Sequence, residues 1–229
     1  RTGIGSEGII LIQKSQKADF RMRFFNPDGG EAEMCGNGAR CAAKLAFDIG
    51  VAPRCMTIET IAGILKAEIL SENVKLFMTE PKDWKLKGIL SINGTKLNYS
   101  FVNTGVPHTV IVVPKLDSID VKNIGAKVRY HKQFAPAGTN VNFIQKVNNS
   151  TIKIRTYERG VEDETLACGT GITASALIAC RKGLVKPPVK VIAKSGDILV
   201  VNFRSENEKV SDVTLLGPAV YVFTGTIAY

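Results

Sequence analysis

The amino-acid sequence predicts an α+β protein made of two similar halves. Apolar and polar residues alternate along much of the chain, as half-buried β-strands require. Only two segments are clear helices, and both are rich in alanine. Each helix lies in a repeated stretch of sequence, so one set of strands with one helix is expected twice. We expect the functional site in the cleft between the two halves.

The strands are predicted from the alternation. Phe20 and Met22 would face a core, while Arg21 and Arg23 would face solvent. Further strand-like segments lie around residues 8–12, 74–78, 100–103, 110–113, 151–157, 190–194, 198–203 and 219–224.

The two clear helices are predicted to begin near Gly38 and Gly171. Each ends close to another glycine, Gly50 or Gly183, which can adopt the backbone conformation that stops a helix. Residues 117–132 are a weaker third candidate.

The repeat joins residues 31–46 to residues 164–179 without a gap. Small residues recur where a helix would pack closely on a sheet. The alignment pairs Glu31 with Glu164, Cys35 with Cys168, Gly36 with Gly169, Gly38 with Gly171, Ala43 with Ala176, and Ala46 with Ala179.

Composition indicates a globular chain. The 229 residues are 45% hydrophobic, which is enough for a substantial core. Neither a transmembrane stretch nor a signal peptide is recognisable, so a soluble cytoplasmic protein without membrane partners is expected. Five cysteines are an odd number, which favours reduced thiols over a disulfide framework. The net charge of +9 is spread along the chain without a nucleic-acid motif, so we interpret it as solvated surface.

Chemistry is predicted at the repeated cysteines. Cys35 and Cys168 each stand two residues before a good N-cap, Asn37 or Thr170, at the start of a helix. Unpaired N–H groups and the helix dipole favour an anion there, and should lower the pKa of the thiol. Two such groups could act as base and acid on opposite faces of a carbanion, which would invert a stereocentre without a cofactor or a metal.

A simpler interpretation is available for a single cysteine, which is more often a small buried apolar residue. Cys41, Cys55 and Cys180 lack the Cys-Gly-x-Gly setting and fit that interpretation. The spacing of Cys35 and Cys41 is not that of a structural zinc site, so no metal is expected.

At these residues the sequence resembles the diaminopimelate epimerase family. The resemblance is specific in FFNPDGGEAEMCGNGARC (residues 24–41) and YERGVEDETLACGTG (residues 157–171). Weaker matches are GIG at residues 3–5, NTGVPH at 103–108, GTNVNF at 138–143 and GPA at 217–219.

The resemblance implies a fold of two pseudo-symmetric domains, each a mostly antiparallel sheet wrapped around a central helix. The first would comprise residues 1–80 with 217–229, and the second residues 81–216. It also implies an isomerase that needs no cofactor and interconverts LL- and meso-2,6-diaminopimelate for lysine and peptidoglycan precursors, with a homodimer as the expected assembly. Its only other partner would be the amino-acid substrate.

The resemblance assigns roles to individual residues. Cys35 and Cys168 match the acid and base pair. The substrate-binding positions fall on Asn26, Gly36, Asn37, Asn140, Glu158, Arg159, Gly169 and Thr170, and His108 matches a histidine near the reacting centre. Arg159 could grip a carboxylate, and Glu158 could pair with an ammonium group.

The sequence also departs from the family pattern. Val106 stands where most members have an asparagine that contacts substrate, and one extra residue separates Arg159 from Cys168. The family's opening Gly-x-Gly-Asn-Asp-Phe segment is absent before the GIG motif, so we expect the first strands of the fold to be missing from this chain. Two alternatives remain open. One is a racemase of the same fold for glutamate, proline or histidine; the other is a non-enzymatic redox or nucleic-acid-binding module.

Overall fold

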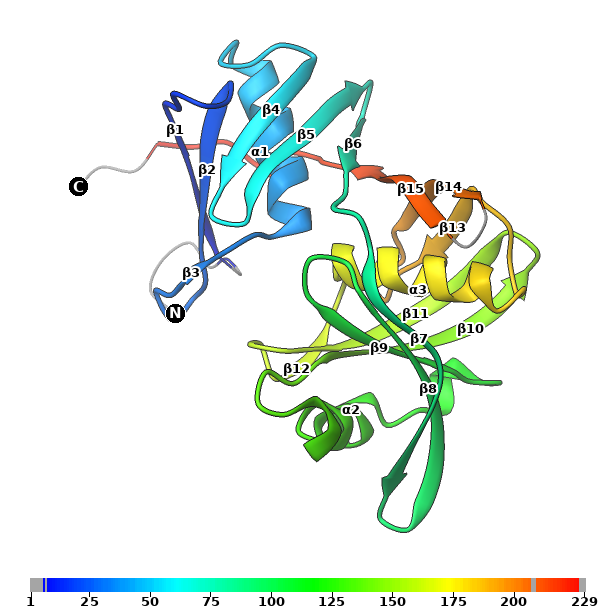
Figure 1. Ribbon diagram of the computed structural model, residues 1–229. Helices are drawn as coiled ribbons and strands as arrows, with labels where there is room; N and C mark the ends of the chain where they lie inside the picture. Colours follow the sequence, from blue (N-terminus) through cyan, green and yellow to red (C-terminus); the bar gives the residue numbers. More distant parts are fainter. Residues whose placement is uncertain (1–5, 7, 207–208, 227–229) are drawn as a thin grey trace. The chain divides into compact units, whose positions relative to one another are not determined.

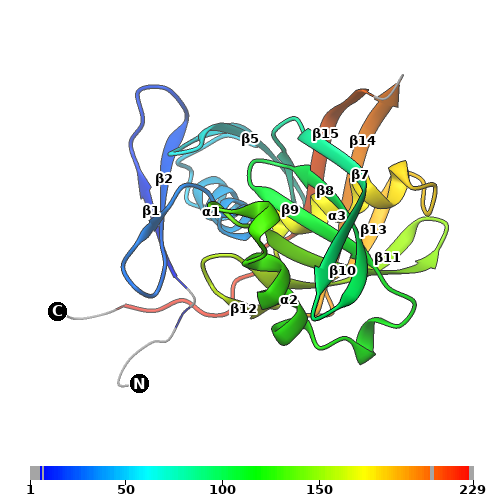
Figure 2. The ribbon, with the colours of Figure 1, turned by 60° about the horizontal axis from the view of Figure 1, so that its bottom comes forward.

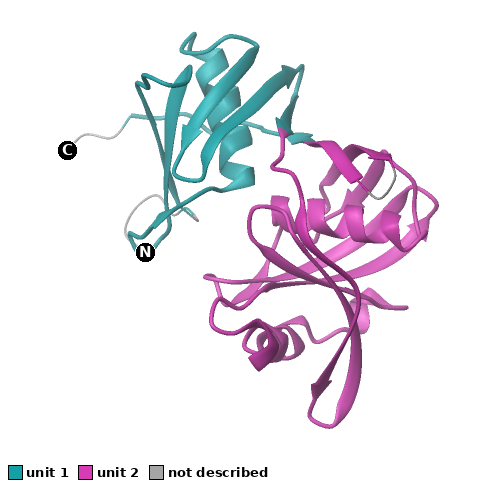
Figure 3. Cartoon of the chain, viewed as in Figure 1, with its two compact units in different colours: residues 1–76, 216–229 teal, residues 77–215 magenta. Residues whose placement is uncertain are grey.

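The chain forms two compact units (Figure 3). Unit 1 comprises Arg1–Leu76 with Leu216–Tyr229, and unit 2 comprises Phe77–Leu215. The computed structural model describes residues 6, 8–206 and 209–226, so the GIG motif at residues 3–5 lies outside the described residues. Unit 2 is thus one continuous segment, whereas unit 1 is built from two segments that flank it.

Unit 1 packs one long helix on a sheet with the order β1-β2-β4-β5-β6 (Figure 1). Its elements are β1 (Ile9–Gln13), β2 (Phe20–Phe25), β3 (Glu31–Ala32), α1 (Gly36–Asp48), β4 (Cys55–Thr60), β5 (Gly63–Leu70) and β6 (Asn73–Phe77). β2 lies antiparallel to β1 and parallel to β4, and β3 forms a short hairpin with β2. The alanines of α1 provide its buried face, so the helix lies close to the strands.

Unit 2 has a larger sheet with the order β15-β14-β13-β11-β10-β9-β8-β7. Its strands are β7 (Lys82–Ile92), β8 (Thr95–Asn103), β9 (Pro107–Val112), β10 (Asn140–Asn148), β11 (Thr151–Glu158), β12 (Asp163–Thr165), β13 (Val189–Ile192), β14 (Ile198–Glu206) and β15 (Lys209–Pro218). Its helices are α2 (Val121–Arg129) and α3 (Gly169–Arg181), with 3₁₀ turns at Leu116–Ser118 and Lys132–Phe134. None of the helices in the described part of the chain is long and apolar enough to cross a membrane.

The two helices of unit 2 cover opposite faces of its sheet (Figures 1 and 2). Val110 and Ile144 pack with α3, whereas their neighbours Ile111 and Phe143 pack with α2. Successive residues of a strand point to opposite faces, so β9 and β10 are buried on both sides. α3 itself is buried at Gly169 and at every position through Ala179.

The sequence repeat corresponds to a repeat of structure. In unit 2, β11 is antiparallel to β10, parallel to β13, and paired with the short β12 that precedes α3. β2 has the same relations to β1, β4 and β3 in unit 1. The registers of the two short hairpins agree as well. The residue opposite Glu31 is Phe25, and the residue opposite Glu164 is Tyr157, and each lies two residues after the arginine of its long strand, Arg23 or Arg155.

The helix ends agree with the sequence prediction. Gly50 and Gly183 follow α1 and α3 with φ of +72° and +70°, the left-handed region that glycine adopts without strain. The next residue in each copy bonds back across the last turn, with Val51 N–H 2.8 Å from the carbonyl oxygen of Ala46. The weaker third helix is also present, as α2 within residues 117–132.

One predicted strand is wrong, because residues 219–224 form neither strand nor helix. The side chains there do not pack against a core, because the four residues Val220, Tyr221, Val222 and Phe223 are 52–89% exposed. β15 ends at Pro218, which cannot donate to a strand ladder. The Tyr221 hydroxyl donates instead to Asp48 at the end of α1, at 2.8 Å.

Candidate active site

Cys35 is the N-cap residue of α1. Its backbone is extended, with φ −133° and ψ 116°, and its carbonyl accepts the first helical hydrogen bond from Ala39 N–H at 2.8 Å. Its Sγ atom accepts a hydrogen bond from Gly38 N–H at 3.3 Å. The half-buried sulfur therefore occupies the place that a serine or aspartate oxygen usually takes at a helix start.

Cys168 has the same position in unit 2, as the N-cap residue of α3. Its backbone is extended, with φ −122° and ψ 110°, and its carbonyl accepts from Ile172 N–H at 2.8 Å. The thiol is 7% exposed, and its Sγ atom lies 3.5 Å from the Thr170 hydroxyl. Both repeated cysteines thus lie at the first turn of a 13-residue helix.

The expectation that Asn37 and Thr170 are the N-caps is wrong, since both lie inside the helices, which begin at Gly36 and Gly169. The Asn37 side chain accepts from Arg40 Nη2 at 3.1 Å. Cysteine ranks low as a cap by residue preference, but here it has the extended backbone that a cap requires. Each sulfur is consequently closer to its helix than the sequence predicted.

The first turns favour an anion. Their leading N–H groups precede the first intrahelical hydrogen bond, and the positive end of the helix dipole lies there. Neither helix has an acidic residue in its first turn. Gly36 and Gly169 next to the sulfurs carry no side chain that would keep an anionic group away.

An arginine–glutamate pair holds the strand hairpin before each cysteine. Arg23 binds Glu31 through two hydrogen bonds of 2.8 and 2.7 Å, and Arg155 binds Glu164 through two of 2.7 and 2.8 Å. The hydrogen bond to Arg23 lowers the pKa of Glu31. Burial alone would raise the pKa of Glu164, but the hydrogen bonds from Arg155 and Lys194 outweigh it, and the net shift is downward. Both glutamates are therefore charged clamps four residues before a cysteine.

His108 lies in β9 and is completely buried. Burial and, to a smaller extent, the nearby charge of Arg159 lower its pKa from 6.5 to about 3, so the imidazole is neutral. Its Nδ1 atom lies 3.1 Å from the side-chain nitrogen of Asn142 in β10. Asn142 also accepts a hydrogen bond of 3.0 Å from the Thr156 hydroxyl of β11. The sequence indicated neither Asn142 nor Thr156.

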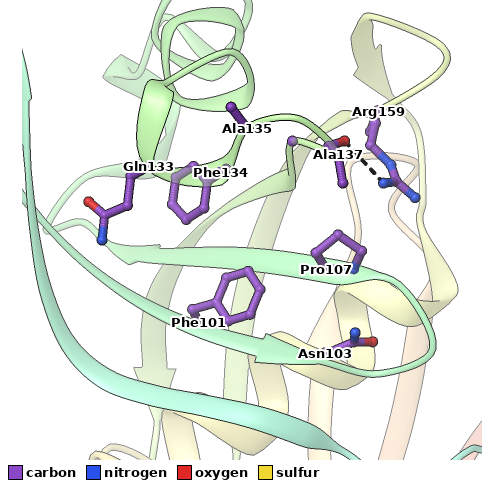
Figure 4. A pocket seen from close by; sticks show the side chains of 9 residues that line it. Phe101, Asn103, Pro107, Gln133, Phe134, Ala135, Ala137 and Arg159 are labelled. Atoms are coloured by element: carbon purple, nitrogen blue, oxygen red, sulfur yellow. Dashed lines mark hydrogen bonds between the residues drawn. The ribbon is translucent and has the colours of Figure 1, made fainter.

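Asn140 connects the segments around Arg159. Its amide nitrogen donates to the Pro107 carbonyl at 3.2 Å, and its amide oxygen accepts from Arg159 N–H at 2.8 Å. The Arg159 guanidinium donates to the Ala137 carbonyl at 3.2 Å and lines a pocket of about 380 Å³ (Figure 4). Glu158 is half-buried at the end of β11. Asn140, Glu158 and Arg159 are therefore close together at one end of β10 and β11.

Asn26 is exposed in the turn between β2 and β3. Its N–H group donates to the Gly30 carbonyl, and its own carbonyl accepts from Gly29 N–H, both at 2.9 Å. Gly29 has φ +84°, in the left-handed region that glycine adopts without strain. The backbone of Asn26 is thus used by the turn, and a substrate-binding role for its side chain stays a prediction.

A family model described as diaminopimelate epimerase matches residues 1–84 and 100–222. The chain belongs to the diaminopimelate epimerase family. It is 45% identical over 232 residues to the diaminopimelate epimerase of Aquifex aeolicus, covering 99% of this chain and 82% of that protein. It is 46% identical to that of Hydrogenobaculum sp., covering 100% of this chain and 83% of that protein.

Solved structures show the wider distribution of the fold. A phenazine biosynthesis protein of the PhzF family from Bacillus anthracis has a TM-score of 0.74 at 20% identity, over 96% of this chain and 84% of that chain. A hydroxyproline epimerase from Agrobacterium vitis has a TM-score of 0.71 at 16% identity, over 92% of this chain and 72% of that chain. The prediction of an α+β fold with few helices is confirmed.

Val106 is the position at which the sequence is expected to depart from the family pattern. It lies half-buried in the loop from β8 to β9, and its carbonyl accepts from Thr104 N–H at 3.2 Å. The Thr104 hydroxyl in turn donates to the Thr170 carbonyl in the first turn of α3, at 3.1 Å. This loop is therefore fixed to the Cys168 helix although Val106 brings no polar side chain to it.

Proposed function

We propose that this protein interconverts LL- and meso-2,6-diaminopimelate without pyridoxal phosphate, using Cys35 and Cys168. The observation that carries the proposal is the repeated N-cap: each thiol lies at the first turn of an equivalent helix, preceded by an equivalent strand hairpin. Proteins named diaminopimelate epimerase that are 45% and 46% identical support the substrate.

The reaction needs one thiolate and one thiol. The thiolate takes the proton from the α-carbon, so an S–H bond forms, the C–H bond breaks, and the electron pair stays on carbon. The second cysteine then gives its proton to the opposite face, and the two sulfurs end with exchanged protonation states. N–H groups at the two helix starts would bind the carboxylate and stabilise the carbanion. The pair titrates as a coupled system.

The distal end of the substrate would be held by Arg159 and Glu158, with Asn26 nearby in the substrate-bound state. The Arg159 guanidinium suits a carboxylate, and Glu158 suits an ammonium group. Asn140 would act by holding the backbone of Arg159, since both polar atoms of its side chain bond to backbone groups. The product would serve lysine and peptidoglycan synthesis in the cytoplasm, and the enzyme would be a homodimer.

The test is interconversion of the two diaminopimelate isomers in D2O, followed by NMR from each isomer. We expect interconversion with the wild-type chain and a loss of at least about 100-fold in Cys35→Ser and Cys168→Ser, the usual scale of a removed acid or base. Cys41→Ser is the matched control, because Cys41 is an exposed residue of α1. Full interconversion in either of the first two variants would refute the two-thiol mechanism, whereas exchange of the α-proton in one isomer alone would not, because the remaining thiolate can still remove the proton that faces it.

Val106 supports a second candidate, a racemase of another amino acid, because the family's asparagine is absent there. Glutamate, proline and histidine should therefore be tested beside diaminopimelate. Exchange with one of them and none with diaminopimelate would keep the mechanism and replace the substrate. Val106→Asn should then raise activity toward diaminopimelate if the missing amide is what excludes it.

A further inference from the structure

The two cysteine half-sites differ beneath their helices. Ile10 opposes Phe24 in unit 1, and its Cδ1 atom would lie 3.3 Å from a Cβ atom placed on Gly38. In unit 2, Asn142 opposes Thr156, and its Oδ1 atom would lie only 2.4 Å from a Cβ atom placed on Gly171. Asn142 and Thr156 thus stand where unit 1 has isoleucine and phenylalanine.

The orientation of the Asn142 amide is fixed by its neighbours. The residue is completely buried. Its nitrogen lies 3.2 Å from the Thr109 carbonyl, to which only an N–H group can donate. Its oxygen accepts from the Thr156 hydroxyl. A flipped amide would bring two oxygens together at Thr109, and therefore the nitrogen also faces His108.

This orientation decides the tautomer of His108. An amide nitrogen cannot accept a hydrogen bond, so Nδ1 of the neutral imidazole must be the acceptor in the 3.1 Å contact with Asn142. The single ring proton is therefore on Nε2. That atom is buried and has no hydrogen-bond partner among the described residues. Such a group can donate to a negative charge but cannot take a proton.

We propose that Asn142 is a positioning residue that holds His108 as the Nε2–H tautomer, giving the sheet face beneath the Cys168 helix a fixed neutral donor. The inference rests on the proposed function only where it concerns turnover. It makes this half-site chemically different from the Cys35 half-site, where Ile10 and Phe24 take the places of Asn142 and Thr156, although the helices and cysteines repeat. The effect of Asn142 on catalysis passes through His108, in the way that partners of active-site histidines set their tautomer.

The tautomer can be measured without substrate. The chain has two histidines, so ¹⁵N-histidine NMR in a His131→Gln background gives the ring signals of His108 alone. We expect the proton on Nε2 in the otherwise wild-type chain. Asn142→Asp offers an acceptor and should move the proton to Nδ1, and Asn142→Leu should leave both tautomers populated.

Two results would overturn the proposal. One is a proton on Nδ1 in the wild-type chain, and the other is an unchanged Nε2–H signal in a folded Asn142→Leu variant. Folding is checked by the fluorescence of Trp84, the single tryptophan, which lies in unit 2. If Asn142→Asp does not fold, the tautomer measured in Asn142→Leu is the result that tests the proposal.

The kinetic test uses the same variants with diaminopimelate. We expect kcat of Asn142→Leu to fall about 10–100-fold, the range for residues that orient a functional histidine, with KM within about twofold. His131→Gln should match the wild type. A fall in kcat together with a changed tautomer supports the proposal, and an unchanged kcat with a changed tautomer overturns its catalytic part. If the wild-type chain exchanges no amino acid, the proposed function fails, and the NMR result still decides the tautomer.

Discussion

Protonation of His108 should weaken unit 2 in acid. Its pKa is about 3 when folded and 6.5 as the ordinary value, because burial disfavours the cation. Between these two pH values the unfolded chain binds a proton that the folded chain does not. The contribution of the neutral imidazole to the free energy of unfolding is therefore full above the ordinary pKa and is lost as the pH falls toward the folded pKa. The slope is about 1.4 kcal/mol per pH unit, which gives roughly 2 to 3 kcal/mol between about pH 6 and pH 4.

The assay is urea unfolding of the full chain at several pH values, followed by Trp84 fluorescence. His108→Gln cannot take up the proton, so the free energy of unfolding should fall less steeply with pH than in the wild type. Other titrating groups cancel in the difference between the two chains. His131→Gln is the matched control and should keep the wild-type slope, since His131 is not buried. Parallel pH profiles for His108→Gln and the wild type would refute a buried neutral imidazole.

Three further substitutions test the packing and the ion pair around the site. Gly171→Ala should cost about 1–3 kcal/mol, because its Cβ atom would meet Asn142 Oδ1 at 2.4 Å. Gly38→Ala should be nearly neutral, because its Cβ atom would meet the end of the Ile10 side chain at 3.3 Å and the Cβ and Sγ atoms of Cys35 at the ordinary contact distances of 3.4 and 3.5 Å. Thermal unfolding measures both, and equal losses would contradict the reasoning. Arg155→Met should cost about 3 kcal/mol in urea unfolding at neutral pH, since it leaves the Glu164 side chain, 11% exposed, with Lys194 as its remaining ion-pair partner among the described residues. A cost below about 1 kcal/mol would show that the clamp does not hold the hairpin.

The sequence predicted the helices of the repeat from their alanines and the glycines that stop them, and many strands from the alternation of apolar and polar residues. β10 was missed because Asn140 to Ile144 are all buried, so no alternation marks the strand. Two helices, α2 and α3, cover its two faces, and their positions depend on distant parts of the chain. At residues 219–224 the opposite error occurred: a strand was predicted where none forms, because the apolar side chains of residues 220–223 are exposed and do not pack against a core.

For the site, the repeat was enough to select both cysteines and place them at helix starts. The caps were placed two residues late because residue preference favoured Asn37 and Thr170, whereas backbone conformation decides the cap. The contact between Asn142 and His108 could not be predicted, because 34 positions separate the two residues. Only the pairing of β9 with β10 brings them together.

The division of unit 1 into two segments sets an order of events during synthesis. Residues 77–215 are continuous, so all of unit 2 has been synthesised before the later segment of unit 1 is added. Unit 1 has to wait for the later segment, because Arg40 Nε in α1 donates to the Pro218 carbonyl at 3.3 Å and Ala219 is 6% exposed in its core. The half that is begun first is therefore finished last, and its alanine-rich helix is left without its full set of contacts until the ribosome has passed residue 219.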